Sequence, residues 1–184
     1  RRGSNGAYQA QAAGAGFDFS LTLTETQPLL LQGDRGLSRK GPEPKQASYY
    51  YSLPQLRAAG TLRLGGKPLD VQGQAWLDHE WSDELLHPQA VGWDWIGMNL
   101  TDGSALTAFQ LRTKAGAALW DGGSFRHPAM GLDPAPHVFS PGEVVFRPVR
   151  YWVSPLTGAR YPVEWLVRTP ADIYTVRAIV DNQE

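Results

Sequence analysis

The chain has 184 residues, a formal net charge of −1 and 42% hydrophobic residues, enough for a folded core at the usual domain size of roughly 150 residues. The near-zero charge provides no basic surface for nucleic acid or an anionic membrane, and no run of about 18 apolar residues predicts a transmembrane helix. Cysteine is absent, which excludes disulfides, zinc thiolates and cysteine nucleophiles.

The N-terminal third predicts two strands after an irregular beginning. Residues 1–16 are small and polar, which favours a poorly ordered segment. Phe17–Thr24 (FDFSLTLT) alternates with a period of two, as a half-buried strand does. Residues 28–41 are rich in turn residues and predict a loop, and the aromatic stretch Ser48–Leu53 predicts a strand that ends at Pro54.

Glycine turns predict hairpins in the middle of the chain. Gly65-Gly66 separates TLRL from PLDVQGQAWL, and Asp102-Gly103 separates GWDWIGMNL from ALTAFQLR; both are typical hairpin turns. A third hairpin is predicted within ALWDGGSFR, residues 118–126. Helical periodicity is weak, and residues 84–90 predict at most one helical turn, which Pro88 interrupts.

The last third begins with a proline-rich connector, residues 132–143, and continues with strand-like segments at Tyr161–Val167 and Ile173–Val180. Many short strands joined by turn signals predict an all-β protein, either a barrel or a sandwich. About 45 residues after the connector are too few for a second barrel.

One short region gathers most of the candidate site residues. Within about 20 positions it contains four of the chain's 7 tryptophans together with acidic and imidazole groups. These residues are Trp76, Asp78, His79, Glu80, Trp81, Trp93, Asp94 and Trp95. Exposed indole and buried unpaired carboxylate are both costly, so the mixture indicates an apolar pocket with a few polar groups. A tryptophan-rich core beneath a solvated sheet face is the alternative.

Strand alternation divides these residues between two faces. An extended segment places Trp76, Asp78 and Glu80 on one face, and His79 and Trp81 on the other, unless a bulge near Asp78 shifts the faces. Parity alone does not identify the face that lines a pocket. A hydrogen-bonded structural histidine at His79, and a turn cap or surface pair at Asp78 and Glu80, remain open.

Asp94 is harder to explain as a structural residue because strands disfavour aspartate and it stands between Trp93 and Trp95. Arg112 is interpreted as its structural counter-ion. The four histidines, His79, His87, His127 and His137, lack the paired spacing of metal ligands, so we expect neither a metal nor another cofactor.

Several segments resemble the family of AttH and carotenoid 1,2-hydratase-like proteins. They are LLLQGDRGLSRKG, SYYYSLPQL, GTLRLGGKPLDVQGQAWLDHEWS, GWDWIGMNLTDGSALTAFQLR and YWVSPLTGARYPVEW. The resemblance implies lipocalin-like antiparallel β-domains and a secreted or periplasmic location, although the chain shows no signal peptide. It also implies a fragment of two such domains, with residues 1–137 ending the first domain and residues 138–184 beginning a truncated second one.

The resemblance further implies a reaction in some members, the cofactor-independent addition of water to a C=C bond. An acid protonates the alkene, and indole faces stabilise the carbocation. The catalytic candidates are Asp78, His79 and Asp94. The substrate-binding candidates are Trp81, Trp93, Trp95, Glu80 and Phe109. We expect His79, Trp81, Asp94 and Trp95 to border one cavity, with Asp78 and Glu80 orienting His79. The His79-x-Trp81 pair resembles the His/Trp pair of the hydratases, but their Tyr/Asp pair falls near Phe109 and Leu111, which disfavours carotenoid hydration.

Three functions therefore remain open for a protein that binds an apolar, isoprenoid- or lipid-like molecule. It is a hydratase, a non-catalytic carrier of a lipid or envelope component, or a catalyst of a pericyclic reaction through cavity shape. The family label of predicted secreted hydrolase has little support, because Ser52, Ser82 and Ser104 lie in no nucleophile elbow.

The missing parts of both predicted domains should leave strand edges unprotected. We therefore expect a homo-oligomer, or association with a complementary chain, in sedimentation experiments. A monomer with two closed barrels built from these residues alone would contradict this expectation.

Overall fold

The computed structural model describes residues 6–83, 86–128 and 135–184, and within these ranges the regular structure consists of β-strands without a helix. The strands are β1 (Tyr8–Gly14), β2 (Phe17–Thr24), β3 (Leu30–Leu31), β4 (Leu37–Arg39), β5 (Ala47–Leu64), β6 (Lys67–Trp81), β7 (Gly92–Asn99), β8 (Ala105–Arg112), β9 (Ala118–Arg126), β10 (His137–Phe139), β11 (Val145–Val153), β12 (Arg160–Arg168) and β13 (Ile173–Arg177). The predicted all-β class and its low helix content are confirmed.

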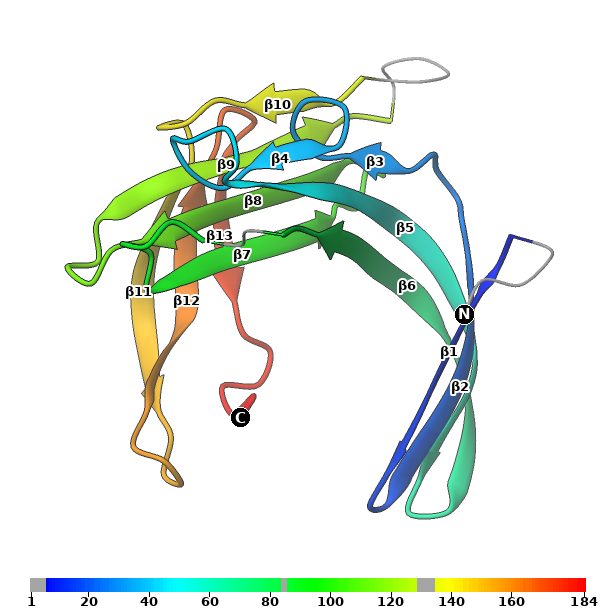
Figure 1. The fold of residues 1–184 in the computed structure, drawn as a ribbon. Coiled ribbons are helices and arrows are strands. Elements are labelled where there is room, and N and C mark those ends of the chain that lie inside the picture. Colours follow the sequence, from blue (N-terminus) through cyan, green and yellow to red (C-terminus); the bar gives the residue numbers. More distant parts are fainter. Residues whose placement is uncertain (1–5, 84–85, 129–134) are drawn as a thin grey trace.

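The strands form three antiparallel sheets (Figure 1). In the first sheet β5 is central: β2, β3 and β4 pair along one edge, β6 pairs with the other, and β1 extends beyond β2. The second sheet has the order β10-β9-β8-β7, and the third has the order β11-β12-β13. Figure 1 shows β5 and β6 as a curved pair that runs from beside β7 to β1 and β2. The sheets do not close into a complete barrel.

The three sheets pack around two hydrophobic cores. One lies on the first sheet and contains Leu23, Leu53 and Leu56. The other joins the second and third sheets, where Leu106 and Ala108 of β8 pack with the segment from β10 to β12; its further buried members are Phe139, Val144, Phe146 and Val167. The proposed domain division at residues 137 and 138 falls inside β10, which pairs with β9, and stays a prediction.

The predicted end of a strand at Pro54 is wrong, because β5 continues through it to Leu64. The pairing register with β6 shifts between Leu53 and Leu56, so the proline is accommodated in a bulge. Gln55 adopts a positive φ of 55°. Its backbone N–H donates to Asn99 Oδ1 at 2.7 Å, and this contact compensates for the lost ladder bond.

Two further predictions are corrected. Part of the N-terminal segment expected to be poorly ordered forms β1, which pairs with β2 from Tyr8 to Gly14; residues 1–5 lie outside the described residues. The third predicted hairpin is instead the continuous strand β9. Gly123 there serves a close approach and not a turn, because a Cβ at this position would lie 2.0 Å from the carbonyl oxygen of Thr107 on β8.

The hairpins at Gly65-Gly66 and Asp102-Gly103 are confirmed, as the pairs β5–β6 and β7–β8. The predicted helical turn is partly outside the described residues, at 84–85; beyond them Ala90 N–H donates to His87 O at 2.8 Å. The proline-rich connector is not wholly irregular, since β10 lies within it.

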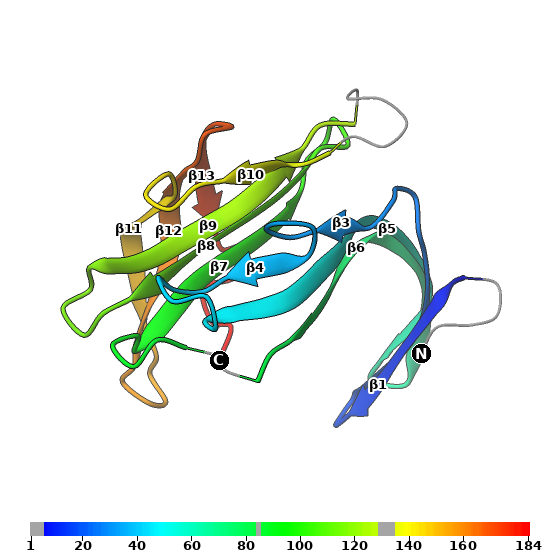
Figure 2. The ribbon, with the colours of Figure 1, turned by 45° about the horizontal axis from the view of Figure 1, so that its top comes forward.

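The buried side-chain amide of Gln32 joins the first sheet to the second. Gln32, only 2% exposed, donates from Nε2 to Ser52 Oγ of β5 at 3.0 Å and to Thr107 Oγ1 of β8 at 2.9 Å. Its Oε1 accepts from Ser124 Oγ of β9 at 2.7 Å. Figures 1 and 2 show β3 and β4, which flank Gln32, along β5, with which both pair. The inner faces of the two sheets are held together here.

We predict that Gln32→Met lowers the free energy of unfolding by roughly 1–3 kcal/mol, because it leaves buried hydroxyls without their partner. Gln11→Met is the control, since Gln11 is exposed and bonds to Ser20 at the surface. Urea unfolding of both variants checks this. An equal, small effect of the two substitutions would show that the buried amide does not hold the sheets.

Candidate ligand-binding site

The register of β5 on β6 assigns the predicted site residues to faces. Ser52 pairs with Asp78 and Tyr50 with Glu80, while Tyr51 pairs with His79. Because side chains alternate along a strand, Asp78 and Glu80 share the inner face, toward the second sheet. His79 and Trp81 lie on the opposite, outer face.

The outer face carries a row of aromatic rings. The His79 ring lies 5.2 Å from that of Tyr51, stacked, and 5.0 Å from that of Trp81, edge to face. Trp81 in turn stacks on Tyr49 at 5.6 Å. The expectation that Asp78 and Glu80 orient His79 within one shared cavity is therefore wrong, because the carboxylates and the imidazole point to different faces. A catalytic role for His79 stays a prediction.

On the inner face Asp78 accepts hydrogen bonds from three donors. Tyr50 Oη and Ser52 Oγ donate to Oδ1 at 2.8 and 2.6 Å, and Trp76 Nε1 donates to Oδ2 at 2.9 Å. Trp95 Nε1 of β7 donates to Tyr50 Oη at 3.2 Å. Two indoles, a phenol and a carboxylate thus form one connected network between β5, β6 and β7.

Burial raises the pKa of Tyr50, and the neighbouring Asp78 raises it further. The phenol is therefore neutral across the physiological range and acts as a hydrogen-bond donor to Asp78. Only 3% of Tyr50 is exposed, whereas Asp78 remains accessible.

Beside this network lies the pair of Lys40 and Glu80. Lys40 Nζ is 3.0 Å from Glu80 Oε1 and donates to Ser38 Oγ at 3.0 Å. Ser48 Oγ also donates to Glu80 Oε1, at 2.5 Å. The ammonium stands 4.3 Å from the ring centroid of Phe109 and 5.0 Å from that of Tyr50. Burial lowers the pKa of Lys40, and Glu80 opposes that shift.

These groups border a cavity of about 140 Å³ between β6 and β7, which we call the indole cavity. Its lining residues are Lys40, Ser48, Glu80, Ser82, Leu86, Trp93, Trp95, Phe109 and Leu111. Strand β7 supplies the indoles because Trp93 pairs with Leu111 and Trp95 with Phe109 on β8, so all four face inward. The structure thereby brings together four predicted residues, Glu80, Trp93, Trp95 and Phe109.

Asp94 points away from the indole cavity, as alternation along β7 requires. Its Oδ2 lies 2.8 Å from Arg112 Nε, the counter-ion expected from the sequence. Burial raises the pKa of Asp94, and Arg112 opposes this shift. The side chain borders a separate groove with Phe146 and Trp165.

Sequence reasoning missed Lys40, Ser48 and Tyr50. Tyr50 was interpreted only as part of an aromatic strand, and Lys40 lies in a segment read as a loop. Local sequence carries no signal for their position. Ser48 and Tyr50 reach the site through the pairing of β5 with β6 about 30 residues later, and Lys40 through its contact with Glu80.

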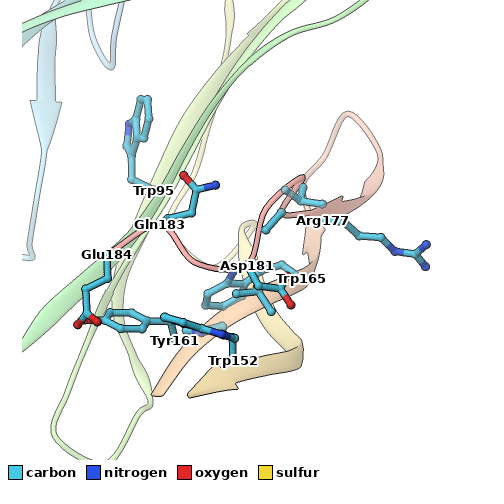
Figure 3. A pocket seen from close by; sticks show the side chains of 12 residues that line it. Trp95, Trp152, Tyr161, Trp165, Arg177, Asp181, Gln183 and Glu184 are labelled. Atoms are coloured by element: carbon cyan, nitrogen blue, oxygen red, sulfur yellow. The ribbon is translucent and has the colours of Figure 1, made fainter. Parts of the chain in front are cut away.

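A larger, open cavity of about 640 Å³ lies between Trp95 and the third sheet (Figure 3). Figure 3 shows Glu184 beside the Tyr161 ring. The acidic groups here already have partners: Tyr161 Oη donates to Glu184 at 2.9 Å, and Asp181 accepts two bonds from Arg150. Most of the wall of this cavity comes from β11, β12 and β13, and the C-terminal segment after β13 completes it.

Within the described residues, no group of three or more His, Cys, Asp or Glu side chains is placed to hold a metal ion. The described part of the chain also contains no helix of the length and apolarity needed to cross a membrane.

The chain is similar to one known protein family and to solved structures of other proteins. A family model described as AttH-like matches residues 1–184. A crystal structure of an AttH from Nitrosomonas europaea matches all of the chain with a TM-score of 0.93 and 43% identity. Kievitone hydratase from Nectria haematococca matches 97% of it with a TM-score of 0.75 and 16% identity, a likeness of fold alone. No curated protein matches the sequence.

The chain spans about half the length of these solved structures, 56% of the first and 53% of the second.

We predict that stability depends on pH through Lys40. Its folded-state pKa is lowered below the ordinary 10.5, so between the two values the unfolded chain binds more protons than the folded one. The free energy of unfolding should therefore rise with pH across that interval, relative to Lys40→Met. Urea unfolding at several alkaline pH values measures this difference. Lys114→Met, at an exposed turn, should follow the wild-type curve, and a parallel Lys40→Met curve would contradict the assignment.

Proposed function

The chain belongs to the AttH-like family, and on that premise we propose that it binds an apolar, isoprenoid- or lipid-like molecule in the indole cavity. The observation that carries the proposal is the convergence of Trp93, Trp95, Phe109 and Leu111 on one cavity whose few polar groups are held by hydrogen bonds and an ion pair to one another. This combination of apolar wall and sparse polar groups is typical of small-molecule sites.

The volume of the cavity suits a small apolar group. At about 140 Å³ it resembles the cavity of roughly 150 Å³ that binds benzene in an engineered protein. One ring or one branched prenyl unit would fill it, and the remainder of a longer ligand would lie outside. Trp93 is 61% exposed and Trp95 43% exposed, so a ligand would cover apolar surface that now faces solvent.

We predict that Trp93→Ala weakens the binding of geraniol, a neutral C10 isoprenoid alcohol, by about 1.5–3 kcal/mol because apolar contact area is lost. Trp81→Ala is the matched control, since Trp81 is similarly exposed, at 50%, but lies on the outer face. Isothermal titration calorimetry measures both. If Trp81→Ala weakens binding and Trp93→Ala does not, the ligand binds the outer aromatic row, near His79.

Hydration of a C=C bond is the second candidate function, favoured by the Tyr50–Asp78–Trp95 network beside the cavity and by the shared fold with a hydratase. Because the pKa of Tyr50 is raised, the phenol is a poor acid. Asp78 would be the acid that transfers a proton to one alkene carbon. Water would then bond to the other carbon and return a proton to Asp78.

The cation formed between these two steps would lie near the faces of Trp93 and Trp95. Cation–π attraction of this kind is worth up to about 2 kcal/mol or more when the pair is desolvated. A carrier needs the same aromatic wall but no acid, so substitution of the acid separates the two functions.

We predict for a hydratase that Asp78→Asn lowers the rate of water addition at least about 100-fold, as loss of a general acid does, and leaves geraniol affinity unchanged. Incorporation of ¹⁸O from labelled water, followed by mass spectrometry, measures the rate. His79→Ala should retain the rate; a loss with His79→Ala alone would assign the acid to the outer face. Binding without any incorporation by the wild-type protein would identify a carrier.

A further inference from the structure

The pair of Lys40 and Glu80 leaves hydrogen-bonding capacity unused at the wall of the indole cavity. A lysine ammonium has three N–H donors. Two of them are engaged, with Ser38 Oγ and Glu80 Oε1. Among the described residues the third has no hydrogen-bond partner, and the ring centroids of Phe109 and Tyr50 lie 4.3 and 5.0 Å from the ammonium.

Glu80 likewise has unused capacity to accept hydrogen bonds. Its Oε1 accepts from both Ser48 Oγ and Lys40 Nζ, and in the ranges that the structure describes no hydrogen bond reaches Oε2. Both side chains line the indole cavity. The cavity wall therefore offers one donor and one acceptor side by side among indole and phenyl surfaces.

From this arrangement we infer that Lys40 and Glu80 form a subsite for one neutral hydroxyl group of the bound apolar molecule. The hydroxyl oxygen accepts from Lys40 Nζ, and its proton is donated to Glu80 Oε2. The inference rests on the proposed ligand binding in the indole cavity and narrows the ligand class to apolar alcohols and phenols.

The charges of the pair discriminate against other head groups. A carboxylate can accept from Lys40 but meets the negative charge of Glu80, and an ammonium can donate to Glu80 but meets the positive charge of Lys40. Like charges in a partly buried site are costly because solvent screens them poorly. Only a group that both donates and accepts uses the pair without adding a charge.

Neighbouring side chains hold both charged groups of the subsite in place. Lys40 is held by Ser38 on its own segment, and its side chain is only 14% exposed. Glu80 is held by Ser48 of the neighbouring strand β5. These supports fix the position of both charged groups before a ligand arrives, which reduces the entropy lost on binding.

The test uses three C10 isoprenoids that differ only in the head group: geraniol, geranate and geranylamine. Calorimetry at pH 7 should give geraniol at least a tenfold lower Kd than either charged analogue. Glu80→Gln should reduce the ratio of the geranate Kd to the geraniol Kd at least fivefold. Lys40→Met should reduce the ratio of the geranylamine Kd to the geraniol Kd to a similar extent. Lys114→Met, which removes a distant exposed charge, should leave both ratios unchanged.

Circular dichroism establishes that each variant is folded, and if Lys40→Met is not, Glu80→Gln carries the test alone. Kd values within threefold of one another for the three compounds would overturn the hydroxyl subsite while leaving the cavity as an apolar binding site. An unchanged ratio of the geranate Kd to the geraniol Kd in the Glu80→Gln variant would overturn the hydroxyl subsite as well. If the folded wild-type protein binds none of the three compounds, both the subsite and the proposed binding function fail.

Discussion

The register of β5 on β6 is the constraint on which the site depends. With Ser52 opposite Asp78 and Tyr50 opposite Glu80, both carboxylates face the second sheet, and His79 and Trp81 face away from it. A slip of one residue would exchange the two sets, because side chains alternate with a period of two. The bulge at Pro54 and Gln55 protects this register, since Gln55 is anchored to Asn99 and Leu100 at the end of β7.

The register also explains how polar groups persist beside an apolar cavity. Carboxylates beside an apolar wall are tolerated where hydrogen-bond partners are supplied. Asp78 receives three donors and Glu80 two, all from side chains that the pairing brings to one face. Gln32 then holds this face against β8 and β9, which places the aromatic side chains of β7 and β8 opposite the carboxylates.

Much of the fold was predictable because its signals are local. Alternation in Phe17–Thr24 and the glycine turns at Gly65-Gly66 and Asp102-Gly103 identify strands and hairpins without reference to distant residues. The structures at Pro54 and Gly123 differ from the predicted strand end and hairpin for the opposite reason. A bulge with a side-chain anchor accommodates Pro54, and the close approach of β8 and β9 requires Gly123. Both features depend on tertiary contacts.

The site was predictable only in part. The density of indole and carboxyl groups indicates Glu80, Trp93 and Trp95, which the structure brings to one cavity. Strand parity separates Asp78 from His79, as the pairing register does. Which face lines the cavity depends on the packing of the first sheet on the second, and Lys40 arrives from a segment about 40 residues earlier in sequence than Glu80. No local pattern encodes either fact.

An apolar ligand should occupy the inner face of β7 and not the outer aromatic row of β6. Titration of ¹⁵N-tryptophan-labelled protein with geraniol distinguishes the two faces, with each indole N–H signal assigned by Trp→Phe substitution. The signals of Trp93 and Trp95 should shift progressively, and the signal of Trp81 should not. A shift confined to Trp81, with Trp93 and Trp95 unchanged, would contradict this placement of the ligand.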